Sequence, residues 1–369
     1  MLDLLDSRKV CSYAYPRVQR VDNDRLCSGG ARARFDPRAL DTDGAVVRLV
    51  QTGMSAKVVT ITGGSGFVGQ LLRVGLAESG YDVRVFDRMR GGLVNLLRRR
   101  YLGTSQSSLG LKCAQQIRSL QRWAEPALVE SGVLRPSGDD ILDFRSRMAE
   151  RLRGSYAVVH LAGIPHPRMP GAIDADFRRI NYEGSLNVFE AARDAGVSKF
   201  IFASSGQVYG INDPVRIDQL PILESNYCPV LEEGQNLYGW LKVEFERYME
   251  QAATNGKTQG IAIRLEFPGL LSRSPANFFI STSIENVVAG FVGALEAPMS
   301  FGFESVNLAD GDVDPEIVDV QEFIRQQWPE VPNHTTGNES LLSIAKARSL
   351  LGYRPVRDGR YLHLSLAGP

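Results

Sequence analysis

The stretch that decides the fold reads Val58-Val59-Thr60-Ile61-Thr62-Gly63-Gly64-Ser65-Gly66-Phe67-Val68-Gly69. Its apolar start is typical of a buried strand, and a helical pattern follows the last glycine. Gly63, Gly66 and Gly69 permit a tight turn and let backbone N–H groups approach a pyrophosphate, whose charge the start of a helix favours. The next strand ends at Asp87, where a carboxylate can bind ribose hydroxyls. The stretch therefore predicts a dinucleotide-binding turn between a strand and a helix.

Two neighbouring residues bear on which dinucleotide is bound. Asp87 can accept hydrogen bonds from ribose hydroxyls, and its negative charge would repel the 2′-phosphate of NADP. Arg88 follows at once and would instead attract that phosphate. We therefore predict NAD as the cofactor, with NADP as the less favoured alternative. The residues of this region expected to contact the cofactor are Gly63, Gly66, Phe67, Val68, Gly69, Asp87 and Arg88.

The composition is that of an ordinary globular protein of 369 residues, with 43% hydrophobic and 23% charged residues. Lys plus Arg and Asp plus Glu number 42 each, so no bulk charge points to a nucleic acid. The four cysteines have no paired spacing, and the four histidines have no metal-ligand spacing. No apolar run approaches the length of a membrane span, and the N-terminus lacks a signal-peptide core. We expect a cytoplasmic protein with a small-molecule substrate and without a metal, a nucleic-acid partner or a membrane contact.

Short apolar runs alternate with helical patterns along most of the chain, which predicts parallel strands joined by helices. The strands are expected at Val58–Ile61, Val83–Phe86, Ala157–Leu161, Phe200–Ala203, Ile261–Ile263 and Val306–Leu308. The helices are expected at Gln70–Ser79, Asp143–Leu152, Phe177–Ala195, Tyr238–Ala253 and Ile284–Ala294. We therefore predict an α/β fold with a doubly wound parallel sheet and a small C-terminal substrate lobe.

The sequence also predicts three divisions of the chain. Residues 1–53 show no sustained periodicity, so we expect an extension or an incorrectly assigned start, with Met54 as the natural first residue. Residues 54–265 are predicted to form the dinucleotide-binding domain, with a basic helical insert at about 91–135. Residues 266–369 are predicted to form a small substrate-binding lobe that is partly interleaved with the sheet.

A second set of residues points to proton and hydride transfer. Tyr238 and Lys242 open a helical stretch and lie one turn apart on one face. A phenol is a poor base at neutral pH, but a neighbouring cation stabilises its ionised form and lowers its pKa. Ser205 closes an apolar strand at the carboxyl edge of the predicted sheet, where ligands bind. We predict that Tyr238 exchanges a proton with the substrate oxygen while Ser205 holds that oxygen by a hydrogen bond.

Together these motifs resemble those of the extended short-chain dehydrogenase/reductases, the NAD-dependent epimerase/dehydratase family, from about Lys57 to about Val356. The resemblance implies a Rossmann-type fold, Tyr238 as the general base, and Ser205, Lys242 and Asn181 as the other catalytic residues. It also implies a further set of cofactor contacts, namely Asp140, Ile141, Leu161, Ala162, Gly163, Asn181, Tyr238 and Lys242. A homodimer is implied in the same way.

Departures from the family pattern shape the substrate prediction. Gly206 and Gln207 stand where the family's dehydratases carry Asp-Glu, so dehydration is not expected. Phe267 falls about where nucleotide-sugar enzymes have an asparagine near the diphosphate, and only 19 residues separate Arg264 from Ile284. Little chain is left to enclose a nucleotide diphosphate, a shortening similar to that of the uronate dehydrogenases. The residues expected to contact the substrate are Gly206, Gln207 and Arg264.

The sequence thus predicts an NAD-dependent oxidoreductase or epimerase that transfers hydride reversibly at a hydroxyl-bearing carbon of a sugar, a sugar acid or a nucleotide-sugar. One alternative is a nucleotide-sugar 4-epimerase of the UDP-glucose type, which would retain its NADH where a dehydrogenase releases it. An alternative of another class is a catalytically quiet protein that senses NAD(P) and binds partners. The presence of Tyr238, Lys242 and Ser205 argues against that alternative.

Overall fold

The structure is a computed structural model. It describes residues 56–90, 135–136, 138–167, 171–210, 217–226, 236–253, 258–268, 281–298, 300, 302–313 and 319–355. The chain divides into two units, Met1–Val47 and Arg48–Pro369, and every element described below lies in the second. The predicted extension 1–53 lies outside the described residues. So does the predicted basic insert at about 91–135, apart from Arg135.

Parallel strands form a seven-stranded central sheet. Their order is β2-β1-β5-β6-β7-β8, and β9 also pairs with β7. The strands are β1 (Val58–Thr62), β2 (Asp82–Phe86), β5 (Ala157–His160), β6 (Lys199–Ser205), β7 (Gln259–Pro268), β8 (Ser281–Thr282) and β9 (Phe303–Leu308). A separate antiparallel pair joins β3 (Met89–Arg90) to β4 (Arg135–Pro136). The carboxyl ends of β1, β5, β6 and β7 therefore meet at one edge of the sheet.

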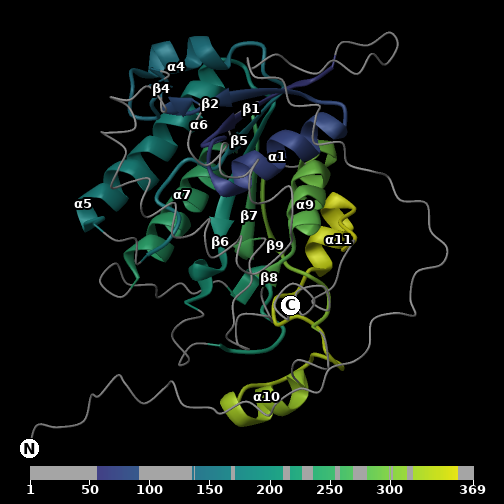
Figure 1. Cartoon of the computed structure of the whole chain (residues 1–369). Helices are drawn as coiled ribbons and strands as arrows, with labels where there is room; N and C mark the ends of the chain where they lie inside the picture. The colour runs from purple at the N-terminus through teal and green to yellow at the C-terminus, as the bar shows by residue number, and fades with distance from the viewer. Residues whose placement is uncertain are drawn as a thin grey trace, which may run out of the picture. The chain divides into compact units, whose positions relative to one another are not determined.

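Helices cover both faces of the sheet (Figure 1). One face carries α1 (Phe67–Glu78), α9 (Ile284–Glu296) and α11 (Ala345–Leu351), and the other carries α4 (Arg145–Leu152), α6 (Gly184–Asp194) and α7 (Leu237–Ala253). Strand side chains alternate between the two faces, so that Val159 and Ile201 pack beneath α1 and α9 while Val158 and Phe200 pack beneath α4 and α6. Burial on both faces explains why these strands are continuously apolar in the sequence.

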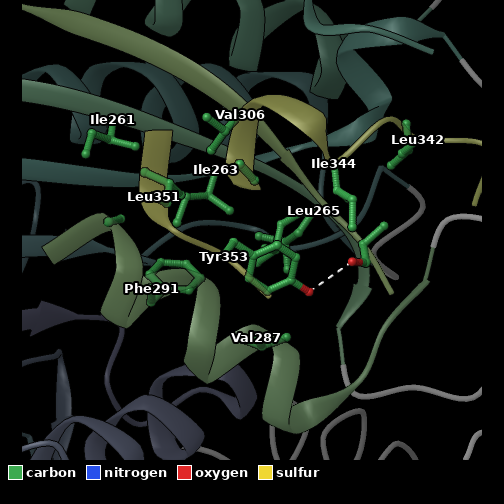
Figure 2. Packing of buried hydrophobic residues seen from close by; sticks show 14 of the residues in the cluster. Ile261, Ile263, Leu265, Val287, Phe291, Val306, Leu342, Ile344, Leu351 and Tyr353 are labelled. Atoms are coloured by element: carbon green, nitrogen blue, oxygen red, sulfur yellow. Dashed lines mark hydrogen bonds between the residues drawn. The ribbon is translucent and has the colours of Figure 1, made fainter. Parts of the chain in front are cut away.

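Leu351 of α11 and Tyr353 pack into the core beside α9, as Figure 2 shows. Val287 and Phe291 of α9 belong to the same buried cluster as Ile263 of β7 and Tyr353. The Tyr353 hydroxyl donates a hydrogen bond to the Ala309 carbonyl at 2.9 Å, which satisfies the polar end of an otherwise buried ring. Two further helices, α5 (Asp174–Asp176) and α10 (Val320–Gln327), lie outside these layers.

The predicted fold class is confirmed, and all six predicted strands are present. One predicted helix differs, because Phe177–Ala195 begins as a π-helix, Phe177–Glu183, before α6 starts at Gly184. A π-helix is closed by i→i+5 hydrogen bonds in place of i→i+4 bonds, which hydrophobic spacing alone does not reveal. The division at residues 265 and 266 stays a prediction. Among the described residues, no helix combines the length and hydrophobicity needed to cross a bilayer.

Candidate active site

The glycine loop after β1 has the geometry of a phosphate-binding turn. Gly63 adopts φ +70°, and a Cβ atom there would lie 2.8 Å from the Ala162 backbone nitrogen. A Cβ atom on Gly69 would lie 2.5 Å from the Gly63 carbonyl oxygen, so both positions require glycine. Helix α1 begins beside the loop with no acidic residue in its first turn, so its own N-terminal end is left favourable to a pyrophosphate. The residues present therefore fit a dinucleotide, and the predicted contacts of Gly63, Gly66, Phe67, Val68 and Gly69 with it stay predictions.

Asp87 lies beside this loop, directly after β2. Its carboxylate accepts a hydrogen bond from the Ser65 backbone N–H at 2.8 Å, which fixes the acidic group next to the phosphate turn. Arg88 follows with an exposed side chain. The fixed negative charge supports NAD over NADP by the repulsion that the sequence predicted.

The loop after β5 closes over the glycine turn. The Leu161 N–H donates to the Thr62 carbonyl at 3.1 Å, and the Ala162 N–H lies 3.4 Å from the Thr62 hydroxyl. These bonds hold Leu161, Ala162 and Gly163 at the carboxyl edge of the sheet. Ile141, which follows Asp140, lies against the start of α6, where the Asn187 side chain donates to the Ile141 carbonyl at 2.8 Å. Their predicted cofactor contacts stay predictions.

Ser205, Tyr238 and Lys242 come together at this edge. Ser205 is the last residue of β6, Tyr238 is the second residue of α7, and Lys242 follows one turn later. The Ser205 hydroxyl donates a hydrogen bond to the Glu266 carboxyl group, and Ser205 also lowers the pKa of Tyr238. The Lys242 ammonium donates to the Ala203 carbonyl at 2.8 Å and lies 5.6 Å from the centre of the Tyr238 ring. The structure thus brings the predicted hydroxyl, phenol and ammonium groups into one cluster.

The electrostatics of this cluster differ from the prediction. Burial raises the pKa of Tyr238 well above its usual value, the Glu266 carboxylate raises it further, and Ser205 lowers it. Burial lowers the pKa of Lys242 to about 8, although Glu246 opposes the shift. The pKa of Tyr238 is therefore raised in the protein alone, not lowered by Lys242 as the sequence predicted. Burial has this effect because desolvation disfavours the ionised phenol.

Asn181 supports the site from the π-helix. Its side chain is buried, accepts a hydrogen bond from the Ile164 N–H at 2.6 Å and donates to the Ile164 carbonyl at 3.0 Å. Its backbone carbonyl accepts a bond from the Ser185 hydroxyl at 2.7 Å. Asn181 thereby fixes the loop that follows β5, beside the predicted cofactor residues.

A buried histidine, which the sequence analysis assigned no role, continues this network. The His160 ring lies 2.7 Å from the Thr62 hydroxyl and 2.9 Å from the Ser185 hydroxyl, so both ring nitrogens have partners. Burial lowers the pKa of His160 to about 3, and the charge on Lys242 lowers it too. His160 therefore stays neutral at physiological pH and links β1, β5 and α6 as a fixed polar bridge.

The predicted substrate residues occupy two different surroundings. Gln207 follows Ser205 in a 3-10 helix, and its side chain accepts a hydrogen bond from Asn236 at 3.1 Å. Gly206 lies between them and is buried.

Arg264 is buried in an ion pair with Glu246 at 2.6 Å. The Arg264 guanidinium also donates to the Tyr209 hydroxyl and the Glu224 carbonyl, each at 2.9 Å. These contacts make Arg264 part of the interior, and its substrate contact stays a prediction.

The sequence analysis missed Glu266, which lies two residues after Arg264 on β7. Its buried carboxyl group accepts hydrogen bonds from the Ser205 hydroxyl and from the Gln207 N–H, the latter at 2.9 Å. The available signal was an acidic residue at the carboxyl end of a buried strand, on the face that Arg264 shares. Among the described residues, no group of three or more His, Cys, Asp or Glu side chains is arranged to hold a metal ion.

The sequence matches a family model described as the NAD dependent epimerase/dehydratase family over residues 59–290. The chain therefore belongs to this family. The match confirms the predicted family of NAD-dependent enzymes, and with the sheet topology it confirms the Rossmann-type fold.

Curated relatives include both an epimerase and a dehydrogenase. The UDP-glucose 4-epimerase uge1 of Schizosaccharomyces pombe is 29% identical over 220 residues, which are 59% of this chain and 53% of that protein. The 3-beta-hydroxysteroid dehydrogenase of Mycolicibacterium neoaurum is 26% identical over 242 residues, 64% of this chain and 54% of that protein. The chain thus spans about half the length of the curated relatives it matches.

A solved structure shares the fold over a longer stretch. A mutated uronate dehydrogenase matches with a TM-score of 0.54 and 17% identity, covering 85% of this chain and 86% of that chain. At this level of identity, the comparison supports the common fold.

Proposed function

We propose that the chain is an NAD-dependent dehydrogenase or epimerase that transfers hydride reversibly at a hydroxyl-bearing carbon of a sugar-type substrate. The observation that carries the proposal is the convergence of Ser205, Tyr238 and Lys242 at the sheet edge that also holds the glycine loop. Open α/β sheets bind their ligands at this edge. The proposal also includes a cytoplasmic location and a homodimer.

Each residue of the cluster has a distinct task in the proposed reaction. Bound NAD supplies a hydride acceptor and a positive charge next to Tyr238. The Tyr238 phenol exchanges the proton of the substrate hydroxyl, and Ser205 holds the same oxygen by a hydrogen bond. Lys242 adds positive potential and binds the ribose, while Asn181 keeps the adjoining loop in place. In this proposal, Gly206 and Gln207 contact the substrate next to Ser205.

The substrate class rests on the short connection between β7 and α9. Since β7 ends at Pro268 and α9 begins at Ile284, little chain is available to enclose a nucleotide diphosphate. This favours a free sugar or sugar acid. A UDP-glucose-type 4-epimerase is a second candidate, because the similarity to the epimerase from Schizosaccharomyces pombe extends over 220 residues.

The proposal is tested by incubating the full chain with NAD and a panel of free sugars, uronates and UDP-sugars. NADH that accumulates with a free sugar or uronate supports a dehydrogenase. A change in product stereochemistry without released NADH supports the epimerase. Tight NAD binding with no turnover of any sugar would instead support the NAD-sensing alternative.

A Tyr238→Phe substitution provides the decisive control. Without the phenolic proton, turnover should fall by about 10²- to 10⁴-fold, because general acid–base catalysis contributes that much to the rate. NAD affinity, measured by calorimetry, should change little, since the glycine loop and Asp87 are intact. Undiminished turnover in a folded variant would refute the enzymatic mechanism.

A further inference from the structure

Asn236 lies directly before α7, the helix that carries Tyr238. Its side-chain oxygen accepts a hydrogen bond from the Gly239 N–H at 3.0 Å, and its carbonyl accepts one from the Trp240 N–H at 2.9 Å. The first N–H groups of a helix have no partner inside the helix, and an asparagine side chain at this position supplies one. Asn236 therefore caps α7 at the turn that carries Tyr238.

The amide nitrogen of the Asn236 side chain binds the turn that follows Ser205. It donates a hydrogen bond to the Gln207 side-chain oxygen at 3.1 Å. Because the Gly239 N–H requires an acceptor, the Asn236 oxygen must face the helix, and its NH2 group must face Gln207. One side chain thus accepts a bond from α7 and donates a bond to the turn after β6.

The turn that Asn236 binds also holds the Ser205 hydroxyl. The Gln207 N–H donates to the Glu266 carboxyl group at 2.9 Å and to the Ser205 oxygen at 3.2 Å. The Ser205 hydroxyl donates to the same carboxyl group. A shift of Gln207 would therefore disturb the contacts that orient the Ser205 hydroxyl.

The backbones of α7 and of this turn lie in direct contact. A Cβ atom on Gly239 would lie 2.5 Å from the Gln207 carbonyl oxygen, so only glycine allows this approach. One turn further along α7, the Lys242 ammonium binds the Ala203 carbonyl of β6 at 2.8 Å. The amide bond and the glycine contact connect the preceding turn of α7, which carries Tyr238, to the same end of the strand.

This inference rests on the proposed function, in which Tyr238 and Ser205 contact one substrate oxygen. We infer that Asn236 is a positioning residue: through Gln207, it keeps the two catalytic groups at the spacing that this oxygen requires. Each of the two groups must come within about 2.6–3.2 Å of the oxygen. A misplacement of about 1 Å can lower the rate by about 10²-fold. The hydrogen bond between the two amides therefore contributes to turnover as well as to the stability of the helix start.

Asn236→Ser separates the capping bond from the bond to Gln207. Serine caps a helix about as well as asparagine, but it has no amide group to donate to Gln207. With the sugar that the unsubstituted chain turns over, kcat and kcat/KM per folded molecule should fall together by about 10- to 10²-fold. Asn236→Ala should lose as much turnover and more stability in urea, because it also lacks the cap. Normal turnover in Asn236→Ser would mean that Asn236 only caps the helix, and it would overturn the inference.

The control is the cap of α10, where the Asp319 side chain accepts a hydrogen bond from the Glu322 N–H at 2.9 Å. Asp319→Ser and Asp319→Ala make the matching pair of changes on a helix to which the proposed function assigns no residue. Asp319→Ala should lose stability, and both variants should keep normal turnover per folded molecule. A loss of turnover in Asp319→Ala as large as that in Asn236→Ala would show that any lost cap slows turnover, and it would contradict the inference.

A double-mutant cycle tests the bond itself without turnover. Gln207→Met removes the acceptor of the Asn236 amide and keeps the length of the side chain. The losses in urea midpoint of Gln207→Met and Asn236→Ser should together exceed the loss in the double variant, because each substitution alone already breaks the shared bond. Additive losses overturn the inference even if no sugar is turned over. Turnover that survives Tyr238→Phe overturns the proposed function, whichever result the cycle gives.

Discussion

Strand β6 places a lysine with a lowered pKa near each of its ends, and the two lysines have different surroundings. Lys199 begins the strand, and Lys242 of α7 donates a hydrogen bond to the carbonyl of Ala203, close to the end of the strand. Burial lowers the pKa of each ammonium to about 8; the charge on Lys57 lowers the pKa of Lys199 further, while Glu296 raises it. The size of the shift therefore does not tell which lysine belongs to the active site.

The partners of the two ammonium groups make the distinction. Lys199 is fully buried and donates to the carbonyls of Ala294, Leu295 and Ala297 at the C-terminal end of α9. That end of a helix carries partial negative charge and three accepting carbonyls, so the interaction is structural. Lys242 has one backbone acceptor and lies close to the Tyr238 and Phe202 rings. A perturbed pKa marks a functional site only when the perturbed group faces a reactive partner.

The largest expected effect is on turnover in Lys242→Met. The variant loses the cation beside Tyr238 and the proposed contact with the ribose, so turnover should fall by about 10²-fold or more. Lys199→Met makes the same substitution at the other end of β6 and should keep normal turnover per folded molecule. Steady-state kinetics, corrected for the folded fraction, measure the turnover of both variants. Equal losses in the two variants would contradict the assignment of Lys242 to the active site.

The second expected effect is on the free energy of unfolding, and here the larger loss is expected for Lys199→Met. Lys199→Met leaves three buried carbonyls at the end of α9 without their donor, so the free energy of unfolding should fall by about 1–3 kcal/mol. Both substitutions relieve the burial of a charge, but Lys242→Met removes the donor of a single carbonyl, so its loss should be smaller. Urea denaturation at neutral pH measures both. A larger loss in Lys242→Met would show that the carbonyl contacts of Lys199 contribute little.

The sequence was sufficient where the determining residues are neighbours along the chain. Apolar runs identified the six predicted strands, and the spacing of Gly63, Gly66 and Gly69 identified the dinucleotide turn. Tyr238 and Lys242 were predicted to act together for the same reason, since one helical turn separates them. Fold and cofactor class depend on such local patterns.

The remaining features depend on contacts between distant segments. Glu266 meets Ser205 across 61 positions, and Lys199 meets the end of α9 across 95 or more. Arg264 was assigned to the substrate because its sequence neighbours do not reveal the ion pair with Glu246 on α7. The raised pKa of Tyr238 arises mainly from burial, which the spacing of Tyr238 and Lys242 in the sequence does not reveal.

The smallest expected effect is on the way in which the free energy of unfolding changes with pH. In the folded protein, the pKa of each lysine is about 8, against an ordinary value of 10.5 in the unfolded chain. Above about pH 8 the folded state therefore binds fewer protons than the unfolded state, so each lysine makes stability rise with pH by up to about 1.4 kcal/mol per pH unit. Below pH 8 both states are protonated, and the burial penalty is constant.

Lys199→Met and Lys242→Met should each reduce this slope between about pH 8 and about pH 10, before unfolded tyrosines ionise. Urea denaturation across that range, on the same two variants, gives the slopes. Because the two lysines lie at opposite ends of β6, the reductions should add in the double variant. A slope that is unchanged in Lys199→Met alone would mean that the three carbonyls keep Lys199 charged. The two lysines would then differ in their charge as well as in their partners.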